Sequence, residues 1–115
     1  MGYLKKVGQG AIYEISSGRI RALSGGAAYV FNGNHLSKSG IGPLYEFLGD
    51  QVRAAYGGIV LEFDGTYVRK PGSGPVAEVS GNRIHTLYGT ESYEIVGILS
   101  KNELLAALAL LYVGS

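Results

Sequence analysis

The feature that most constrains the fold is an internal repeat with a period of 32 residues. Three segments share one pattern, in which apolar residues flank a glutamate and a glycine-containing turn leads to an arginine or histidine. They start at Ile12, Leu44 and Val76. A repeat of this length is one supersecondary unit that buries its apolar face only against its neighbours. The sequence therefore predicts a fold built from repeated units.

Each repeat contains two halves in which apolar and polar residues alternate up to a glycine. This period of two is typical of half-buried β-strands joined in hairpins. We expect two-residue turns at Ser17-Gly18, Gly33-Asn34, Gly49-Asp50, Gly65-Thr66 and Gly81-Asn82. Glycine comes first in most of them, as a type II′ turn requires. These turns place the following residues opposite each other: Ile15 and Ile20, Phe47 and Val52, Val79 and Ile84, Phe31 and Leu36, and Phe63 and Val68.

The same register sets a glutamate opposite a basic residue in every copy. The predicted pairs are Glu14 with Arg21, Glu46 with Arg53, Glu62 with Arg69, and Glu78 with His85. Opposite charges that face each other across strands contribute about 0.2–1 kcal/mol each. An active site usually breaks symmetry, so we interpret the repeated glutamates as ion-pair partners and not as catalytic carboxylates.

The N-terminus begins halfway through a repeat, because residues 1–11 align with residues 33–43 and 65–75. The third repeat lacks this outgoing strand. We therefore predict that residues 3–7 pair with residues 92–96 and close the array, which removes the exposed sheet edge. The predicted fold is all-β: residues 1–97 form a closed pseudo-threefold array of six β-hairpins from three repeats, and the N-terminal strand completes the last repeat.

Residues 98–115 predict a C-terminal apolar α-helix, either part of the same domain or an oligomerisation element. Ser100 and Glu103 have the spacing of a capping box. Residues 104–113 carry no polar group on any face, so the helix packs on its own ring or on copies of the chain, and a second partner is expected to cover what the ring leaves exposed. The residues predicted to carry self-association are Leu104, Leu105, Leu108, Leu111 and Tyr112. A membrane span needs about 20 apolar residues, so membrane contact by this short helix is not expected.

Composition excludes several classes of function. A formal net charge of +1 does not provide the basic field of a nucleic-acid-binding protein. The absence of cysteine excludes disulfides and thiolate metal sites. No catalytic residue, metal ligand or cofactor is predicted, since neither a zinc-binding His motif nor a Ser nucleophile elbow occurs. The first residues lack the apolar core of a signal peptide, which favours a cytoplasmic location.

Repeated tyrosines, and lysines that precede the Gly-x-Gly loops, are the candidates for ligand binding. Equivalent aromatic rings on a β scaffold can form equivalent sites for sugars or small ligands, and a lysine beside a glycine loop can bind an anion. The alternatives are that the rings pack with their hydroxyls in water and that the glycine loops only shape corners between hairpins. The candidate residues are Tyr3, Tyr67, His35, Tyr29, Tyr93, Lys6, Lys38 and Lys70.

Four short motifs carry a resemblance to a known group. They are Tyr13-Glu-Ile, Tyr45-Glu-Phe, Val79-Ser-Gly-Asn-Arg-Ile84 and Tyr93-Glu-Ile. In these, residues 1–97 resemble short bacterial proteins built from Y-E-I-x-G-N-x-I hairpin repeats, described as β-flowers and without an assigned function. The resemblance implies a closed array of hairpins and no activity.

Together these patterns predict a non-enzymatic binding or assembly module that homo-oligomerises, partly through its C-terminal helix. The alternative is a small-ligand or carbohydrate-binding, lectin-like protein that uses the repeated tyrosines and Gly-x-Gly loops. The expected partners are a second copy of the chain, or a small ligand or sugar, but no nucleic acid, and membrane contact by the chain is not expected.

Overall fold

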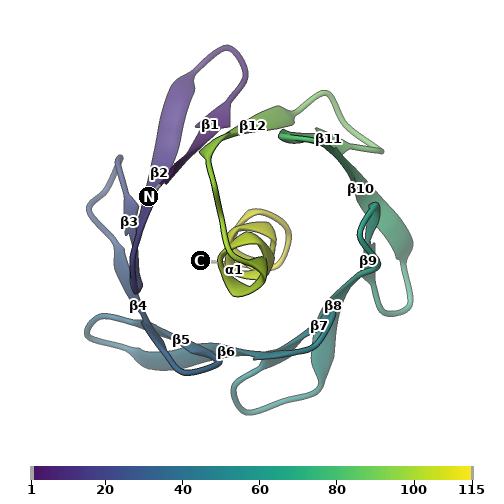
Figure 1. Ribbon diagram of the computed structural model, residues 1–115. Helices are drawn as coiled ribbons and strands as arrows, with labels where there is room; N and C mark the ends of the chain where they lie inside the picture. Colours follow the sequence, from purple (N-terminus) through teal and green to yellow (C-terminus); the bar gives the residue numbers. More distant parts are fainter. Residues whose placement is uncertain (1, 115) are drawn as a thin grey trace.

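The computed structural model, which describes residues 2–114, is a closed antiparallel β-barrel with one helix along its interior (Figure 1). The all-β class, the closed array of hairpins and the C-terminal helix are therefore confirmed. The predicted barrel segment was expected to start at Met1 and the helical segment to end at Ser115. These two residues lie outside the described part of the chain.

Twelve strands follow one another around the barrel in sequence order, so every connection is a hairpin. They are β1 (Gly2–Lys6), β2 (Gly10–Ser16), β3 (Arg19–Ala22), β4 (Ala28–Asn32), β5 (His35–Lys38), β6 (Gly42–Leu48), β7 (Gln51–Ala54), β8 (Ile59–Phe63), β9 (Tyr67–Lys70), β10 (Gly74–Ser80), β11 (Arg83–Thr86) and β12 (Ser92–Gly97). The helix α1 spans Lys101–Tyr112.

The seam that closes the barrel lies between β1 and β12, as predicted. Their antiparallel pairing places Tyr3 opposite Val96 and Leu4 opposite Ile95. β1 also pairs with β2 on its other side. A strand with hydrogen-bonded neighbours on both sides offers no edge to another chain. The N-terminal strand β1 therefore closes the barrel by pairing with both β2 and β12.

The predicted strand register is confirmed across the five tight hairpins. Gly49 and Gly81, the first residues of two of the turns, have φ values of 61°. This left-handed conformation suits glycine because it has no Cβ to clash with the backbone. The turn residues therefore set which side chains of each hairpin face inward.

The inward-facing side chains and α1 form one hydrophobic core. The largest fully buried barrel residues include Leu4, Ile15 and Leu61, and Leu105 and Leu108 of the helix are also fully buried. Buried helix residues run without interruption from position 105 to position 110, so they cover every face of the helix. The surrounding barrel of the same chain provides this burial, while Leu104, Leu111 and Tyr112 stay partly exposed. The expectation that a second partner covers the rest stays a prediction.

Hydrogen bonds stabilise both ends of the helix. At its start, the predicted capping box forms: Ser100 Oγ accepts from the amide of Glu103 at 3.2 Å, and the Glu103 carboxylate accepts from the amide of Ser100 at 2.8 Å. At its finish, the ammonium group of Lys70 donates to the carbonyl oxygen of Tyr112 at 3.1 Å. No helix in residues 2–114 is long and apolar enough to cross a membrane.

These contacts distinguish the two ends of the barrel. The helix starts at the end with the tight hairpin turns, which we call the turn end; there Lys101 forms an ion pair with Asp50. The other end, which we call the loop end, carries the six connections at residues 7–9, 23–27, 39–41, 55–58, 71–73 and 87–91. Figure 1 shows these connections splayed outward, one after another around the ring of strands.

Candidate functional site

Two of the predicted ligand-binding tyrosines belong to the core. Tyr29 is 1% exposed and Tyr93 is 7% exposed. The Tyr29 ring meets Tyr13 edge to face with the centroids 6.5 Å apart, and the Tyr93 ring meets Tyr112 in the same way at 6.3 Å. Such pairs stabilise a core beyond the area that they bury. These rings serve packing, as the alternative interpretation of the sequence proposed.

Three further candidates lie at partly exposed positions near the turn end. Tyr3, His35 and Tyr67 each sit opposite a glutamate of the next strand along the chain. The Arg69 guanidinium lies over the Tyr67 ring, 5.5 Å from its centroid. These residues follow one another around the barrel wall and do not converge on one pocket.

The three candidate lysines lie at the loop end, each the last residue of its strand. Lys70 contacts the helix C-terminus through Tyr112, as described above, and Lys38 lies over the Tyr29 ring at 5.9 Å. Lys6 borders a hollow beside Lys5. A cation near a helix C-terminus is favourable because the last carbonyls carry partial negative charge, and α1 has no basic residue in its last turn. Lys70 therefore has a structural role.

The five residues predicted to carry self-association divide into two groups. Leu105 and Leu108 are fully buried inside the barrel of the same chain, so they cannot contact a partner while the barrel is folded. Leu104, Leu111 and Tyr112 remain partly exposed. The Tyr112 hydroxyl also shares a hydrogen bond with Thr86 Oγ1 at 2.8 Å.

The glutamates have the predicted cross-strand positions, but their ion pairs differ. Arg21 and Glu14 form the expected pair, with 3.0 Å between Nη2 and Oε1. Glu46 lies opposite both Arg53 and His35, and the ion-pair geometry is with His35, whose Nε2 is 3.6 Å from the carboxylate. A glutamate on a central strand has a neighbour on each side, and the hairpin partner alone does not determine which one it contacts.

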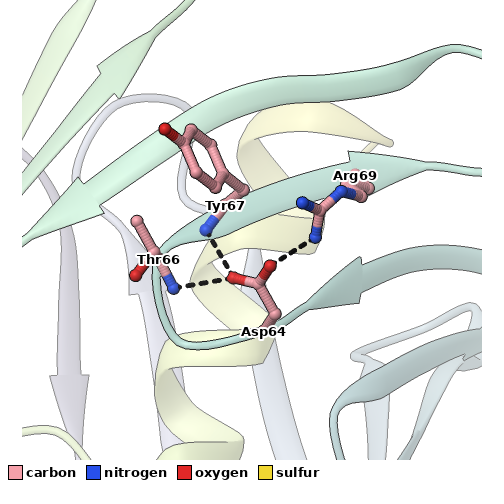
Figure 2. Close-up of polar contacts among 4 residues, drawn as sticks. All are labelled: Asp64, Thr66, Tyr67 and Arg69. Atoms are coloured by element: carbon pink, nitrogen blue, oxygen red, sulfur yellow. Dashed lines mark hydrogen bonds and ion pairs between the residues drawn. The ribbon is translucent and has the colours of Figure 1, made fainter.

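Arg69 also departs from its predicted partner. Its Cα faces Glu62, yet its guanidinium pairs with Asp64 in the adjoining turn (Figure 2). Asp64 is held there because it accepts hydrogen bonds from the amides of Thr66 at 2.9 Å and Tyr67 at 2.7 Å. The hydrogen bond from Arg69, followed by those two amide bonds, lowers the pKa of Asp64 far below its ordinary value.

A shallow hollow of about 300 Å³ at the turn end is bordered by three carboxylates. Each already has a partner in the structure: Asp50 has Lys101, Glu62 has Gln51, and Asp64 has Arg69. Within residues 2–114, no group of three His, Asp or Glu residues has the geometry to hold a metal ion. All three acids that border the hollow are therefore engaged with other residues of the chain.

Three tyrosines are weaker acids than a free tyrosine. Burial is the main reason that the pKa values of Tyr45, Tyr93 and Tyr112 are raised. Tyr45 donates its hydroxyl to the carbonyl oxygen of Gly114 at 2.6 Å. A tyrosine hydroxyl is already protonated at neutral pH at its ordinary pKa of 10.0, and the raised pKa values make ionisation of these three less favourable still.

The loop end has a feature that the sequence interpretation missed. Each of its six connections carries an exposed apolar or aromatic residue, and we call these the tip residues. They are Val7, Leu23, Ile41, Tyr56, Pro71 and Tyr88. Tyr56 is 90% exposed, Tyr88 84% and Ile41 71%. Isolated exposed apolar residues are ordinary, and here one such residue recurs on every loop of one end.

The charges near the two ends also differ. Lys5, Lys6, Lys38 and Lys70 occupy the last two residues of strands that run into the loop end, and Glu91 is the only acidic residue in its six loops. Near the turn end, three acidic residues (Asp50, Asp64 and Glu103) are matched by three basic residues (Arg19, Arg83 and Lys101). An excess of basic residues is therefore found at the loop end and not at the turn end.

One signal for the loop end was present in the sequence. Ile41 lies between the glycines of a Gly-x-Gly loop, and Tyr56 and Tyr88 occupy equivalent positions in successive repeats. Apolar residues in predicted connections, where polar residues are usual, could have marked the loops as a surface. The prediction instead concentrated on glycines and lysines, because those residue types indicate anion binding.

Comparison with protein-family models, curated proteins and solved structures finds no match for this chain. The hairpin-repeat similarity seen in the sequence remains a resemblance. A function for the chain therefore depends on the geometry of its own residues.

Proposed function

We propose that this chain is a non-enzymatic binding module that makes its contacts through the loop end of the barrel. The observation that carries the proposal is the presence of an exposed apolar or aromatic tip residue on all six loops of that end. The helix fills the interior, so binding in this proposal takes place on the outside. The barrel acts as a rigid support that holds the six loops in fixed relative positions.

The absence of an enzymatic role is part of this proposal. It is supported by the local partners of the carboxylates at the turn end. Catalysis needs titratable groups that converge on a space for substrate, and the candidate residues from the sequence are spread over the wall, core and loop end. Binding of a sugar or small ligand by Tyr29 and Tyr93 loses its support because both are buried.

Self-association is a second candidate, with one observation in its favour. Leu111 and Tyr112, predicted to join copies, remain partly exposed where the helix reaches the loop end. A second copy could therefore cover the loop end. The pseudo-threefold symmetry of the barrel and its cytoplasmic location also remain predictions.

The test compares the tagged full chain with two variants in sedimentation of an unclarified cell lysate. The tip variant carries Ile41→Ser, Tyr56→Ser and Tyr88→Ser; the matched control carries Ile98→Ser, which removes an apolar side chain that is 88% exposed near the turn end. We expect the full chain and the control to migrate with larger material and the tip variant to migrate as a single chain, at 12.1 kDa plus the mass of the tag. Identical migration of all three proteins would contradict binding through the loop end. The fractions also report the cellular location.

A further inference from the structure

We propose that the partner of the loop end is an anionic lipid surface, on which the barrel lies with its tip residues at the level of the head groups. This inference rests on the proposed function and assigns its partner class. Three observations carry it: the form of the apolar surface, the placement of the lysines, and the contrast between the two ends.

The apolar surface consists of separate tips and not of one groove. The tip residues come from successive loops that splay outward around the ring (Figure 1). The molecule is wide and shallow, with principal extents of 32, 31 and 22 Å. A folded protein partner would need matching depressions at each tip, whereas a lipid surface accommodates separate apolar side chains without a preformed shape. The geometry therefore favours a broad, deformable surface.

The chemistry of the tips is also that of an interfacial contact. Tyr56 and Tyr88 are the most exposed of them, and tyrosine concentrates at membrane–water interfaces because its ring is apolar and its hydroxyl is polar. Ile41 and Val7 supply aliphatic side chains that can enter the boundary between head groups and acyl chains. Contact of this kind is peripheral and does not require a helix that spans the bilayer.

Four lysines lie immediately behind the tips. Lys5 and Lys6 precede the Val7 loop, Lys38 precedes the Ile41 loop, and Lys70 precedes the Pro71 loop. Long lysine stems can follow apolar material while the ammonium group stays among polar head groups. Positive charge in this place is attracted to anionic lipid over about a Debye length. Two copies of the chain placed loop end to loop end would instead bring eight lysines together, which disfavours a self-associated pair.

The opposite end carries no comparable excess of positive charge. The carboxylates in its turns, Asp50 and Asp64, are each paired with a basic residue, Lys101 and Arg69 respectively. Its most exposed apolar residue is Ile98, which follows β12 and precedes the helix. Ile98 therefore provides a control of comparable exposure on the face that should point away from lipid.

The experiment measures binding of the purified full chain to sedimented vesicles of phosphatidylcholine, with and without phosphatidylserine. We expect binding to the vesicles that contain phosphatidylserine, weaker binding to phosphatidylcholine alone, and a loss of affinity as salt is raised. The tip variant should lose at least tenfold in affinity, and the Ile98→Ser control should bind as the full chain does. Thermal unfolding should be nearly unchanged in both variants, because all four substituted side chains are exposed.

A second variant tests the charge. Lys6→Gln combined with Lys38→Gln should remove most of the preference for phosphatidylserine while leaving the weaker binding to phosphatidylcholine. Equal binding to both vesicle types by the unaltered chain, or equal losses in the tip and Ile98 variants, would overturn the inference.

The outcomes separate this inference from the proposed function. If the chain ignores vesicles but forms a complex that the tip substitutions abolish, with a second copy or with another protein, the lipid inference fails and the loop end remains a contact surface. If the tip substitutions change neither vesicle binding nor sedimentation in the lysate, both proposals fail.

Discussion

Leu108 illustrates how a single residue depends on the whole barrel. It lies in the middle of α1 and is fully buried, although it belongs to the last segment of the chain. Shortening such a side chain in a close-packed interior destabilises the folded protein, because it removes buried apolar atoms and the contacts that they make. Leu108 is therefore a direct probe of the enclosed helix.

Leu108→Ala should lower the free energy of unfolding by about 2–5 kcal/mol, because it leaves a cavity that the surrounding strands can only partly fill. Urea denaturation of the two proteins measures this difference. Ile98→Ala removes an exposed side chain and should stay within about 0.5 kcal/mol of the unaltered chain. Similar small effects at both positions would mean that the helix is not enclosed.

Asp64 gives a residue-level prediction for pH. Its pKa is lowered in the folded state, so its contribution to stability is fully present above the ordinary carboxyl pKa of 3.8 and is lost as the pH falls toward the lowered value. Asp64→Asn removes the charge but keeps an oxygen that can accept from the turn amides. The stability difference between the two proteins should therefore be larger at neutral pH than in acid. Because Asp64 is exposed, the difference should also shrink in high salt.

The pH dependence of thermal unfolding for both proteins measures this effect. A difference that stays constant from neutral pH into acid would show that the ion pair with Arg69 does not contribute.

At the scale of elements, the helix illustrates how local and tertiary signals combine. Ser100 and Glu103 start it through a capping box that is complete in the structure. Three alanines, Ala106, Ala107 and Ala109, give it a narrow profile inside the ring, and all three are buried. A helix of this length is marginal alone in water, so its stability comes from the strands around it.

Ser100→Ala should lower the free energy of unfolding by about 0.5–2 kcal/mol, because the amide of Glu103 loses its acceptor. Ser100→Thr keeps a hydroxyl at the same place and should recover most of the loss. Chemical denaturation of the three proteins orders their stabilities. If alanine and threonine were equally destabilising, the cap would not be the cause.

For the whole molecule, the alternation of residues around glycine turns was sufficient to predict the strands and the register of the five tight hairpins. The closing seam was predicted from the alignment of the N-terminal segment with the repeats. Val79 opposite Ile84 follows from the position of one turn, because a hairpin register is a local property. The location of the helix could not be predicted in the same way. Its apolar faces require burial but do not indicate whether the same chain or another one provides it.

The candidate site was harder to predict than the fold. Tyr29 and Tyr93 were selected because tyrosine can bind ligands, and the structure places both in the core, where the same rings serve packing. Tyr56 and Tyr88 became candidates only when the barrel grouped their loops at one end. The ion-pair partners of Glu46 and Arg69 likewise lie outside the predicted pairs. Glu46 contacts His35 on the adjacent strand, and Arg69 contacts Asp64 in the turn.

The central claim is that α1 is the core of its own barrel, and the proposal of a contact surface at the loop end rests on it. The most direct measurement compares solution mass and thermal unfolding of the full chain with those of a chain that ends at Gly97. We predict a cooperative unfolding transition for the full chain and, for the shortened chain, loss of that transition with aggregation. A shortened chain that remained a folded monomer with an unchanged transition, while the full chain formed an oligomer, would contradict the claim and place the helix between copies.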